Sequence, residues 1–164
     1  MIKTNNITTP ELNDEEVTHH FNLARTSLRQ RSPKILHNKG DYLNRVFNFI
    51  LAESYMHPHL HPGEEKIEKM TLIEGSFALI LFNETGEAKE CTVLEKGKKD
   101  FIEVPPFTWH TYVMLSDKVI IYETMEGIYD IKTWKKMAPW APKENSLEAS
   151  KYLEMLKYKS RRFN

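Results

Sequence analysis

Three histidines lie close together in the segment His57-Pro58-His59-Leu60-His61, and two of them have the spacing of a metal site. Side chains two residues apart on a strand point to the same face, because side chains alternate with a period of two. His59 and His61 can therefore reach one point in space. A carboxylate and another imidazole from other strands would complete the site. The chain has one cysteine, so we expect nitrogen and oxygen ligands rather than a thiolate cluster.

Several glutamates follow the histidines, and strand parity favours Glu68 as the carboxylate ligand. An inward Glu68 places Met70 and Leu72 inward as well. The opposite parity would bury Lys69 and Thr71 without partners, which is unfavourable. Glu68 therefore agrees with the apolar pattern of its own strand.

His110 is the candidate for the remaining imidazole, because it begins a predicted strand directly after the segment 105–109, Pro-Pro-Phe-Thr-Trp. That position can aim the ring into the mouth of a barrel. His57 has the same parity as the other two histidines but precedes Pro58, so we expect a pocket wall or a surface residue, with direct ligation as the alternative. The predicted metal ligands are His59, His61, Glu68 and His110.

The elements that must position these residues are mainly β, with a helix at each end. Asn13 and Glu16 form a capping box, and an apolar stripe of Val17, Phe21, Ala24 and Leu28 follows it. Asn145 and Glu148 form a second capping box before a helix that reaches about Lys157. A helix is therefore predicted on each side of the β region.

Between the helices, from residue 45 onward, apolar residues alternate with a period of two. Strands are predicted over 45–51, around the histidines, on both sides of a hinge at 74–76, and over 91–94, 101–104, 110–115 and 119–123. Short strands without intervening helices indicate an antiparallel sandwich or barrel. We predict a single domain over 13–158, a flexible N-terminus over 1–12 and a basic tail over 159–164.

Composition narrows the classes of function. The chain has 23 basic and 23 acidic residues, which does not suggest a nucleic-acid or anionic-membrane surface. No apolar run approaches the roughly 20 residues that cross a bilayer, and the first residues lack the apolar core of a signal peptide. Cys91 alone cannot form an intrachain disulfide. We therefore expect a cytoplasmic protein.

These residues resemble the two motifs of the cupin superfamily. His59-x-His61, Glu68 and then Gly75 match the first motif, and the segment 105–110 matches the second. The resemblance implies a jelly-roll barrel with a metal at its centre. It implies less about the reaction, because cupins host many chemistries.

A narrower resemblance is to the WbuC-type cupin-fold metalloproteins, which are found among O-antigen and capsule biosynthesis functions. Phe107 departs from the motif, which usually has Gly there, so this turn must avoid a positive φ or carry strain. His57 stands where Arg is common. The matching residues are Ser27-x-Arg29-x-Arg31, His37, Tyr55-x-x-Pro58-His59-x-His61-Pro62, Val104-Pro105-Pro106, Thr108-Trp109-His110, Glu123, Gly127 and Trp140-Ala141-Pro142.

Three imidazoles and one carboxylate leave open positions on an octahedral ion and suit Fe, Mn, Ni or Co, or Zn with four ligands. Tyr112 and Glu123 are candidates for orienting the imidazoles.

Arg29 and Arg31 either hold an anionic ligand or form a solvated helix end. All candidates for binding a substrate are Arg29, Arg31, His37, Arg45, Tyr55 and His57.

Three functions remain open at this point. The first, which we favour, is a metal-dependent isomerisation or epimerisation of a sugar or sugar nucleotide in surface-polysaccharide biosynthesis. The second is a non-catalytic module that binds a saccharide or small acid, favoured by the absence of an obvious second acid–base pair. The third is an Fe(II)-dependent oxygenase. We expect a small-molecule ligand, sugar-derived and anionic, and a homodimer that covers exposed strand edges.

Overall fold

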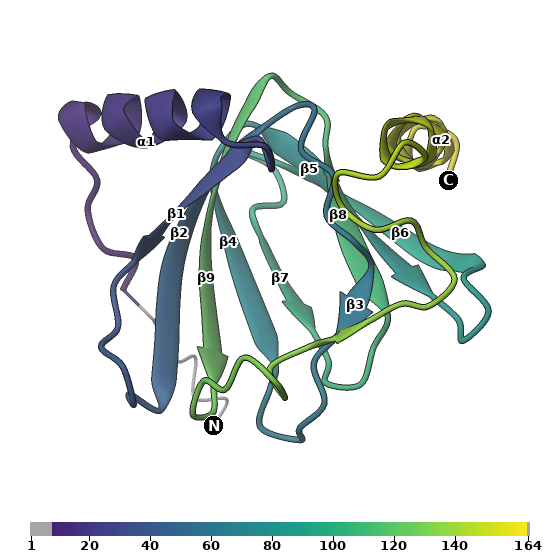
Figure 1. The fold of residues 1–164 in the computed structure, drawn as a ribbon. Coiled ribbons are helices and arrows are strands. Elements are labelled where there is room, and N and C mark those ends of the chain that lie inside the picture. Colours follow the sequence, from purple (N-terminus) through teal and green to yellow (C-terminus); the bar gives the residue numbers. More distant parts are fainter. Residues whose placement is uncertain (1–7, 164) are drawn as a thin grey trace.

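Two antiparallel sheets face each other in the computed structural model, which describes residues 8–163 (Figure 1). The first sheet has the order β1 (Arg31–Ile35), β2 (Leu43–Leu51), β9 (Lys118–Glu126), β4 (Glu68–Glu74), β7 (Phe101–Val104). The second has the order β10 (Lys136–Met137), β3 (His59–Leu60), β8 (His110–Met114), β5 (Ser76–Phe82), β6 (Ala88–Glu95). The predicted fold class, a mainly β jelly-roll barrel with a helix at each end, is confirmed.

The hydrophobic core lies between the sheets and is built from inward positions of several strands. On β4, Met70 and Leu72 are buried while the residues between them are partly exposed, which is the parity predicted from the sequence. Phe77, Leu79 and Met114 of the other sheet belong to the same cluster. The turn between β4 and β5 needs Gly75, whose φ is 86° and where an added Cβ would lie 2.3 Å from the Lys118 carbonyl oxygen.

Helix α1 (Asp14–Thr26) covers the outer face of the first sheet beside β1 and β2 (Figure 1). Its capping box is confirmed: Asn13 Oδ1 accepts from the Glu16 amide at 2.8 Å, and Glu16 Oε2 accepts from the Asn13 amide at 3.1 Å. Phe21 packs edge-to-face on Phe49 of β2 at 5.5 Å between ring centroids. The apolar stripe is one residue too long, because the helix ends at Thr26 and Leu28 is exposed.

Helix α2 (Ala149–Ser160) covers the outer face of the second sheet, where Leu153 and Leu156 pack in one cluster with Ile80 and Val113. The predicted second capping box is wrong. The helix begins at Ala149, so Asn145 lies four residues before it, in a left-handed conformation with φ of 61°. The residue at the N-cap makes no side-chain hydrogen bond there.

Helix α2 continues to Ser160, which is buried, two residues beyond the predicted end of the domain at residue 158. Most of the N-terminus predicted to be flexible, residues 1–7, lies outside the described residues. Neither helix within 8–163 combines the length and apolar character that spanning a bilayer requires.

Candidate metal centre

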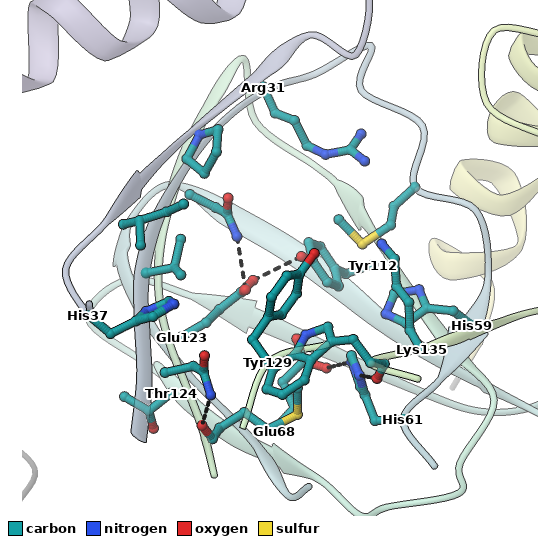
Figure 2. Close-up of a pocket in the computed structure, with 18 of the residues that line it drawn as sticks. Arg31, His37, His59, His61, Glu68, Tyr112, Glu123, Thr124, Tyr129 and Lys135 are labelled. Atoms are coloured by element: carbon teal, nitrogen blue, oxygen red, sulfur yellow. Dashed lines mark hydrogen bonds and ion pairs between the residues drawn. The ribbon is translucent and has the colours of Figure 1, made fainter. Parts of the chain in front are cut away.

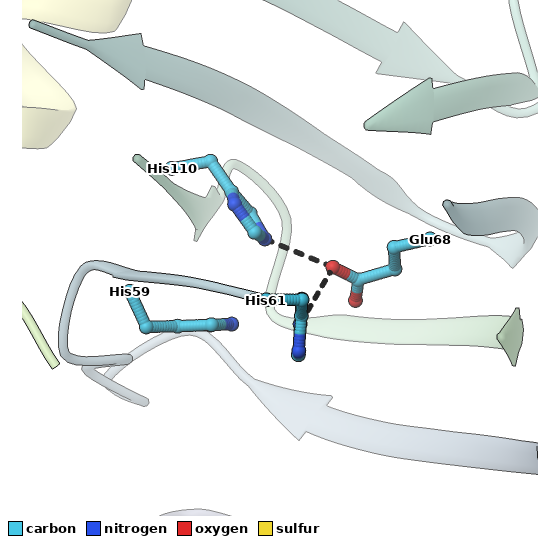
Figure 3. A group of neighbouring side chains, drawn as sticks. All are labelled: His59, His61, Glu68 and His110. Carbon is cyan, nitrogen blue, oxygen red and sulfur yellow. Dashed lines mark hydrogen bonds and ion pairs between the residues drawn. The ribbon is translucent and has the colours of Figure 1, made fainter. Parts of the chain in front are cut away.

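All four predicted metal ligands meet in the interior of the barrel (Figure 3). His59 and His61 come from β3 and the residue after it, His110 begins β8 directly opposite His59, and Glu68 begins β4 in the other sheet. Each side chain is buried. One ligand atom from each residue lies within 4.8 Å of those of the others. The register of these short strands therefore brings the four side chains together from both sheets.

Backbone carbonyls orient the three imidazoles. The Nδ1 atoms of His59, His61 and His110 donate to the carbonyl oxygens of His57, Trp134 and Thr108, at 2.9, 2.9 and 2.8 Å. A neutral ring that donates from Nδ1 has its lone pair on Nε2, the form in which histidine binds a metal.

Tyr112 and Glu123, which the sequence predicted to orient the imidazoles, do not hydrogen-bond to the rings. These two side chains bond to each other, and the backbone already supplies the acceptor that each ring needs.

The group fits a divalent cation. Glu68 Oε2 lies 2.9 Å from His110 Nε2 and 3.3 Å from His61 Nε2, so either a proton or a divalent cation lies where the carboxylate and the ring nitrogens converge. Burial raises the pKa of Glu68, but hydrogen bonds and charge from His110 and His61 in their protonated form outweigh it and hold the pKa well below its usual range. Burial lowers the pKa of His59 well below its usual value. Ligand atoms on opposite sides of a metal lie roughly 4 Å apart, which this group accommodates.

A cavity of about 370 Å³ is lined by three of the four predicted ligands, His59, His61 and Glu68 (Figure 2). Three of the predicted substrate-binding residues line it: Arg29, Arg31 and His37. His37 Nδ1 lies 2.9 Å from the Arg45 amide nitrogen and 3.1 Å from the Arg45 carbonyl oxygen, so it accepts from the first or donates to the second, according to the tautomer. Either tautomer leaves Nε2 as a second polar atom of this cavity-lining side chain.

Arg45, Tyr55 and His57 do not line this cavity, so the structure places them outside the predicted binding site. Tyr55 donates its hydroxyl proton to the Pro142 carbonyl at 2.6 Å. His57 is buried, and its Nε2 donates to the Ala138 carbonyl at 2.8 Å. These side chains fasten the segment between β9 and α2 to the barrel.

Arg29 and Arg31 do not form a solvated helix end, because both pair with Glu144. Arg29 Nε lies 2.8 Å from Glu144 Oε2, and Arg31 Nη2 lies 2.6 Å from Oε1. Arg31 Nη1 also donates to Ser54 Oγ and to the Tyr55 carbonyl, each at 3.2 Å. The arginines therefore join β1 to the segment before α2.

A second carboxyl group, part-buried and separate from the four predicted ligands, lines the same cavity (Figure 2). Glu123 Oε1 accepts from the Tyr112 hydroxyl and Oε2 from Asn48 Nδ2, both at 2.8 Å. Burial and the charge of Glu68 raise the pKa of Glu123 to about 7, against the lowering effect of these two hydrogen bonds. Asn48 was missed by the sequence reasoning, although it stands alone as a polar residue between two phenylalanines of β2.

The segment after β9 supplies three lining residues that the sequence reasoning did not assign to the site: Tyr129, Trp134 and Lys135. The rings of Tyr129 and Trp134 lie 5.2 Å apart, and the Lys66 ammonium lies 5.1 Å from the Trp134 ring centroid. No local pattern marks this segment as part of a pocket. It reaches the site because β10 pairs with β3.

A family model described as "Domain of unknown function (DUF6016)" matches residues 12–94, about half of the chain. The chain belongs to this family. The matched part contains His59, His61 and Glu68 and ends before His110. No curated protein matches the sequence.

Solved structures with similar folds are cupins, and their low sequence identities support likeness of fold alone. Protein SO0799 from Shewanella oneidensis has a TM-score of 0.58 at 10% identity, over 94% of this chain and 98% of that one. The capsular polysaccharide assembling protein CapF from Staphylococcus aureus has a TM-score of 0.56 at 13% identity, over 65% of this chain and 29% of its own. The Lactobacillus farciminis oxalate decarboxylase formate complex has a TM-score of 0.52 at 15% identity, over 82% and 39%. This chain thus spans less than a third of CapF.

Proposed function

We propose that this protein is a metal-dependent cupin enzyme that acts on a sugar or sugar nucleotide in surface-polysaccharide biosynthesis, in an isomerase- or epimerase-like step. One observation carries the proposal: a cavity lined by three members of the three-histidine, one-glutamate group is also lined by a separate, part-buried carboxyl group, Glu123. Isomerisation and epimerisation both need a polarised oxygen and a group that carries a proton.

The metal ion and the chain's own residues would supply different parts of this chemistry. A bound divalent Fe, Mn, Ni, Co or Zn ion would supply Lewis-acid polarisation of a carbonyl or hydroxyl oxygen. Glu123 faces the cavity and would take a proton from the substrate and return it. Tyr112 and Asn48 hold both carboxyl oxygens, which fixes the position of Glu123.

The class of substrate is supported by two independent lines. The sequence resembles the WbuC-type cupins of O-antigen and capsule biosynthesis, and the fold resembles CapF, a capsular polysaccharide assembling protein. Tyr129 and Trp134 offer rings on which the apolar face of a sugar can pack, and His37 offers a ring nitrogen for a hydrogen bond with a hydroxyl.

Metal content is the first test. Protein purified without added metal or affinity tag should contain close to one equivalent of a divalent ion by plasma mass spectrometry. The His59→Ala/His61→Ala variant should lose the ion, and His19→Ala, which removes an exposed histidine of α1, should keep it. Metal-free wild type, even after reloading, would refute the proposal.

Proton exchange tests the reaction. Metal-loaded protein is incubated in D₂O with a panel of sugars and sugar nucleotides, and deuterium incorporation is followed by NMR. We expect exchange in the wild type and none in Glu123→Gln, whose metal content should stay unchanged. Binding without exchange would instead indicate a binding module, and oxygen uptake by the Fe(II)-loaded protein would indicate an oxygenase.

We further propose that residues 13–158 act as one cupin domain in the cytoplasm and that two copies form a homodimer. The single cysteine supports a reducing compartment. Edge strands such as β1 and β7 carry backbone groups that a second copy can cover. Light scattering would show the mass of a dimer, and the mass of a monomer would contradict it.

A further inference from the structure

Among the residues that the structure describes, one ammonium group of the cavity has no hydrogen-bonding or ion-pair partner. Lys135 lines the cavity, and within residues 8–163 its Nζ makes no hydrogen bond and no ion pair with a carboxylate. Its side chain is only partly exposed, and burial, together with the charges of Arg29 and Arg31, lowers its pKa. An ammonium group withdrawn from water without a partner is unfavourable, so this arrangement favours an anion at Lys135.

The two arginine side chains that line the cavity, Arg29 and Arg31, already have partners. Glu144 occupies both guanidinium groups, and Arg31 makes further hydrogen bonds to Ser54 and to the Tyr55 carbonyl. An anionic ligand that bound to these arginines would have to displace Glu144, whose ion pair with Arg31 is largely shielded from water. An anion that binds to Lys135 breaks no ion pair within residues 8–163.

Lys135 also lies on the side of the cavity where the predicted metal ligands are. In Figure 2 it is beside His59 and His61, and its charge is one of the causes that lower the pKa of His59. The preceding residue, Trp134, accepts the His61 Nδ1 hydrogen bond on its carbonyl oxygen. The segment that orients one imidazole therefore also places this ammonium group.

The size of the cavity limits the ligand. Its volume of about 370 Å³ lies at the lower end of the roughly 300–1,000 Å³ found for pockets that enclose small molecules. A single sugar fits this space better than a whole sugar nucleotide.

We propose that Lys135 is the anion-binding residue of this pocket and that the ligand is of monosaccharide size and carries a carboxylate or phosphate group. This inference rests on the proposed function, since it names the substrate class of the same site. The sequence suggested Arg29 and Arg31 as the anion-binding residues. This inference instead places the anion at a lysine between β9 and β10.

Calorimetry with inorganic phosphate, glucuronate and glucose tests the inference on chelator-treated and on metal-loaded protein. We expect at least one anion to bind at least tenfold more tightly than glucose in both forms. Lys135→Met should weaken anion binding at least tenfold, Lys135→Arg should retain it, and Lys132→Met, an exposed lysine of the same segment, should leave it unchanged. Binding of phosphate alone would identify a phosphate ligand, and binding of glucuronate alone a carboxylate.

Two results would overturn the inference: neither anion binds, or Lys135→Met and Lys132→Met bind anions equally well. Thermal unfolding of each variant shows whether it is folded, and Lys135→Arg keeps the test valid if Lys135→Met is not. Anion binding that depends on Lys135 in protein that cannot be loaded with a metal would support the subsite, while the failure to load would count against the metal-dependent reaction. The two proposals therefore fail separately.

Discussion

Neutralising Glu144 should destabilise the protein in a way that depends on pH. This carboxylate pairs with Arg29 and Arg31, and its side chain is 18% exposed. Burial opposes ionisation, but the Arg29 and Arg31 hydrogen bonds and charges lower the pKa of Glu144 from 4.5 to about 2. Because the folded-state pKa is lowered, the stabilisation is complete above about pH 4.5 and is lost as the pH falls toward 2.

The size of this effect follows from the pKa. One unit of pKa corresponds to about 1.4 kcal/mol, so the lowering from 4.5 to about 2 is worth at most ~3 kcal/mol. Arg29 is 48% exposed, and solvent screening weakens its share. We therefore expect Glu144→Gln to lower the free energy of unfolding by ~1–3 kcal/mol near neutral pH.

Urea unfolding of wild type and Glu144→Gln between about pH 7 and pH 3 measures this difference. The difference should shrink as the pH falls below about 4.5. Glu90→Gln, which changes an exposed glutamate of β6, should match the wild type throughout. A difference that stays constant with pH, or a variant as stable as the wild type, would show that the ion pairs do not anchor this segment.

Three further substitutions test the packing and backbone of the fold by urea unfolding. Phe107 has φ of 57° and is 55% exposed, so Phe107→Gly should stabilise by ~0.5–1 kcal/mol; a loss of stability would contradict the strain. Asn13→Ala should cost ~1 kcal/mol by removing the cap of α1, whereas an unchanged midpoint would show that the cap is dispensable. Phe47→Ala should cost ~3–5 kcal/mol, since the ring is fully buried, and a loss under 1 kcal/mol would argue against its packing role.

Strand parity was the most informative property of the sequence. It selected Glu68 together with Met70 and Leu72, and all three are buried on one face of β4. The period of two also indicated an antiparallel sandwich or barrel, because it reflects the local alternation of side chains along each strand, and the resemblance to the cupins narrowed this to a jelly roll. The four predicted ligands come together because the alternation and pairing of the strands fix which side chains point inward.

Residues whose roles depend on distant contacts were predicted less well. Tyr55 and His57 have the right types for a binding site, yet their partners are backbone carbonyls of a segment about eighty residues away. Lys135 has no local signature, and only the pairing of β10 with β3 brings its neighbourhood to the metal centre. The second capping box failed because the true start of α2 is set by packing on the second sheet, through residues such as Leu153.

Strand β2 shows how a correct periodicity can still hide the function of a strand. An antiparallel strand with one solvated face normally turns its polar residues to water, so alternation alone would place Asn48 on the surface. Here helix α1 covers the outer face, and Phe47 and Phe49 are buried beneath it. The polar face is therefore the inner one, and Asn48 reaches Glu123 inside the barrel. The outer helix thus supplies the apolar partner that this strand needs, which leaves its inward positions free to be polar and to build the site.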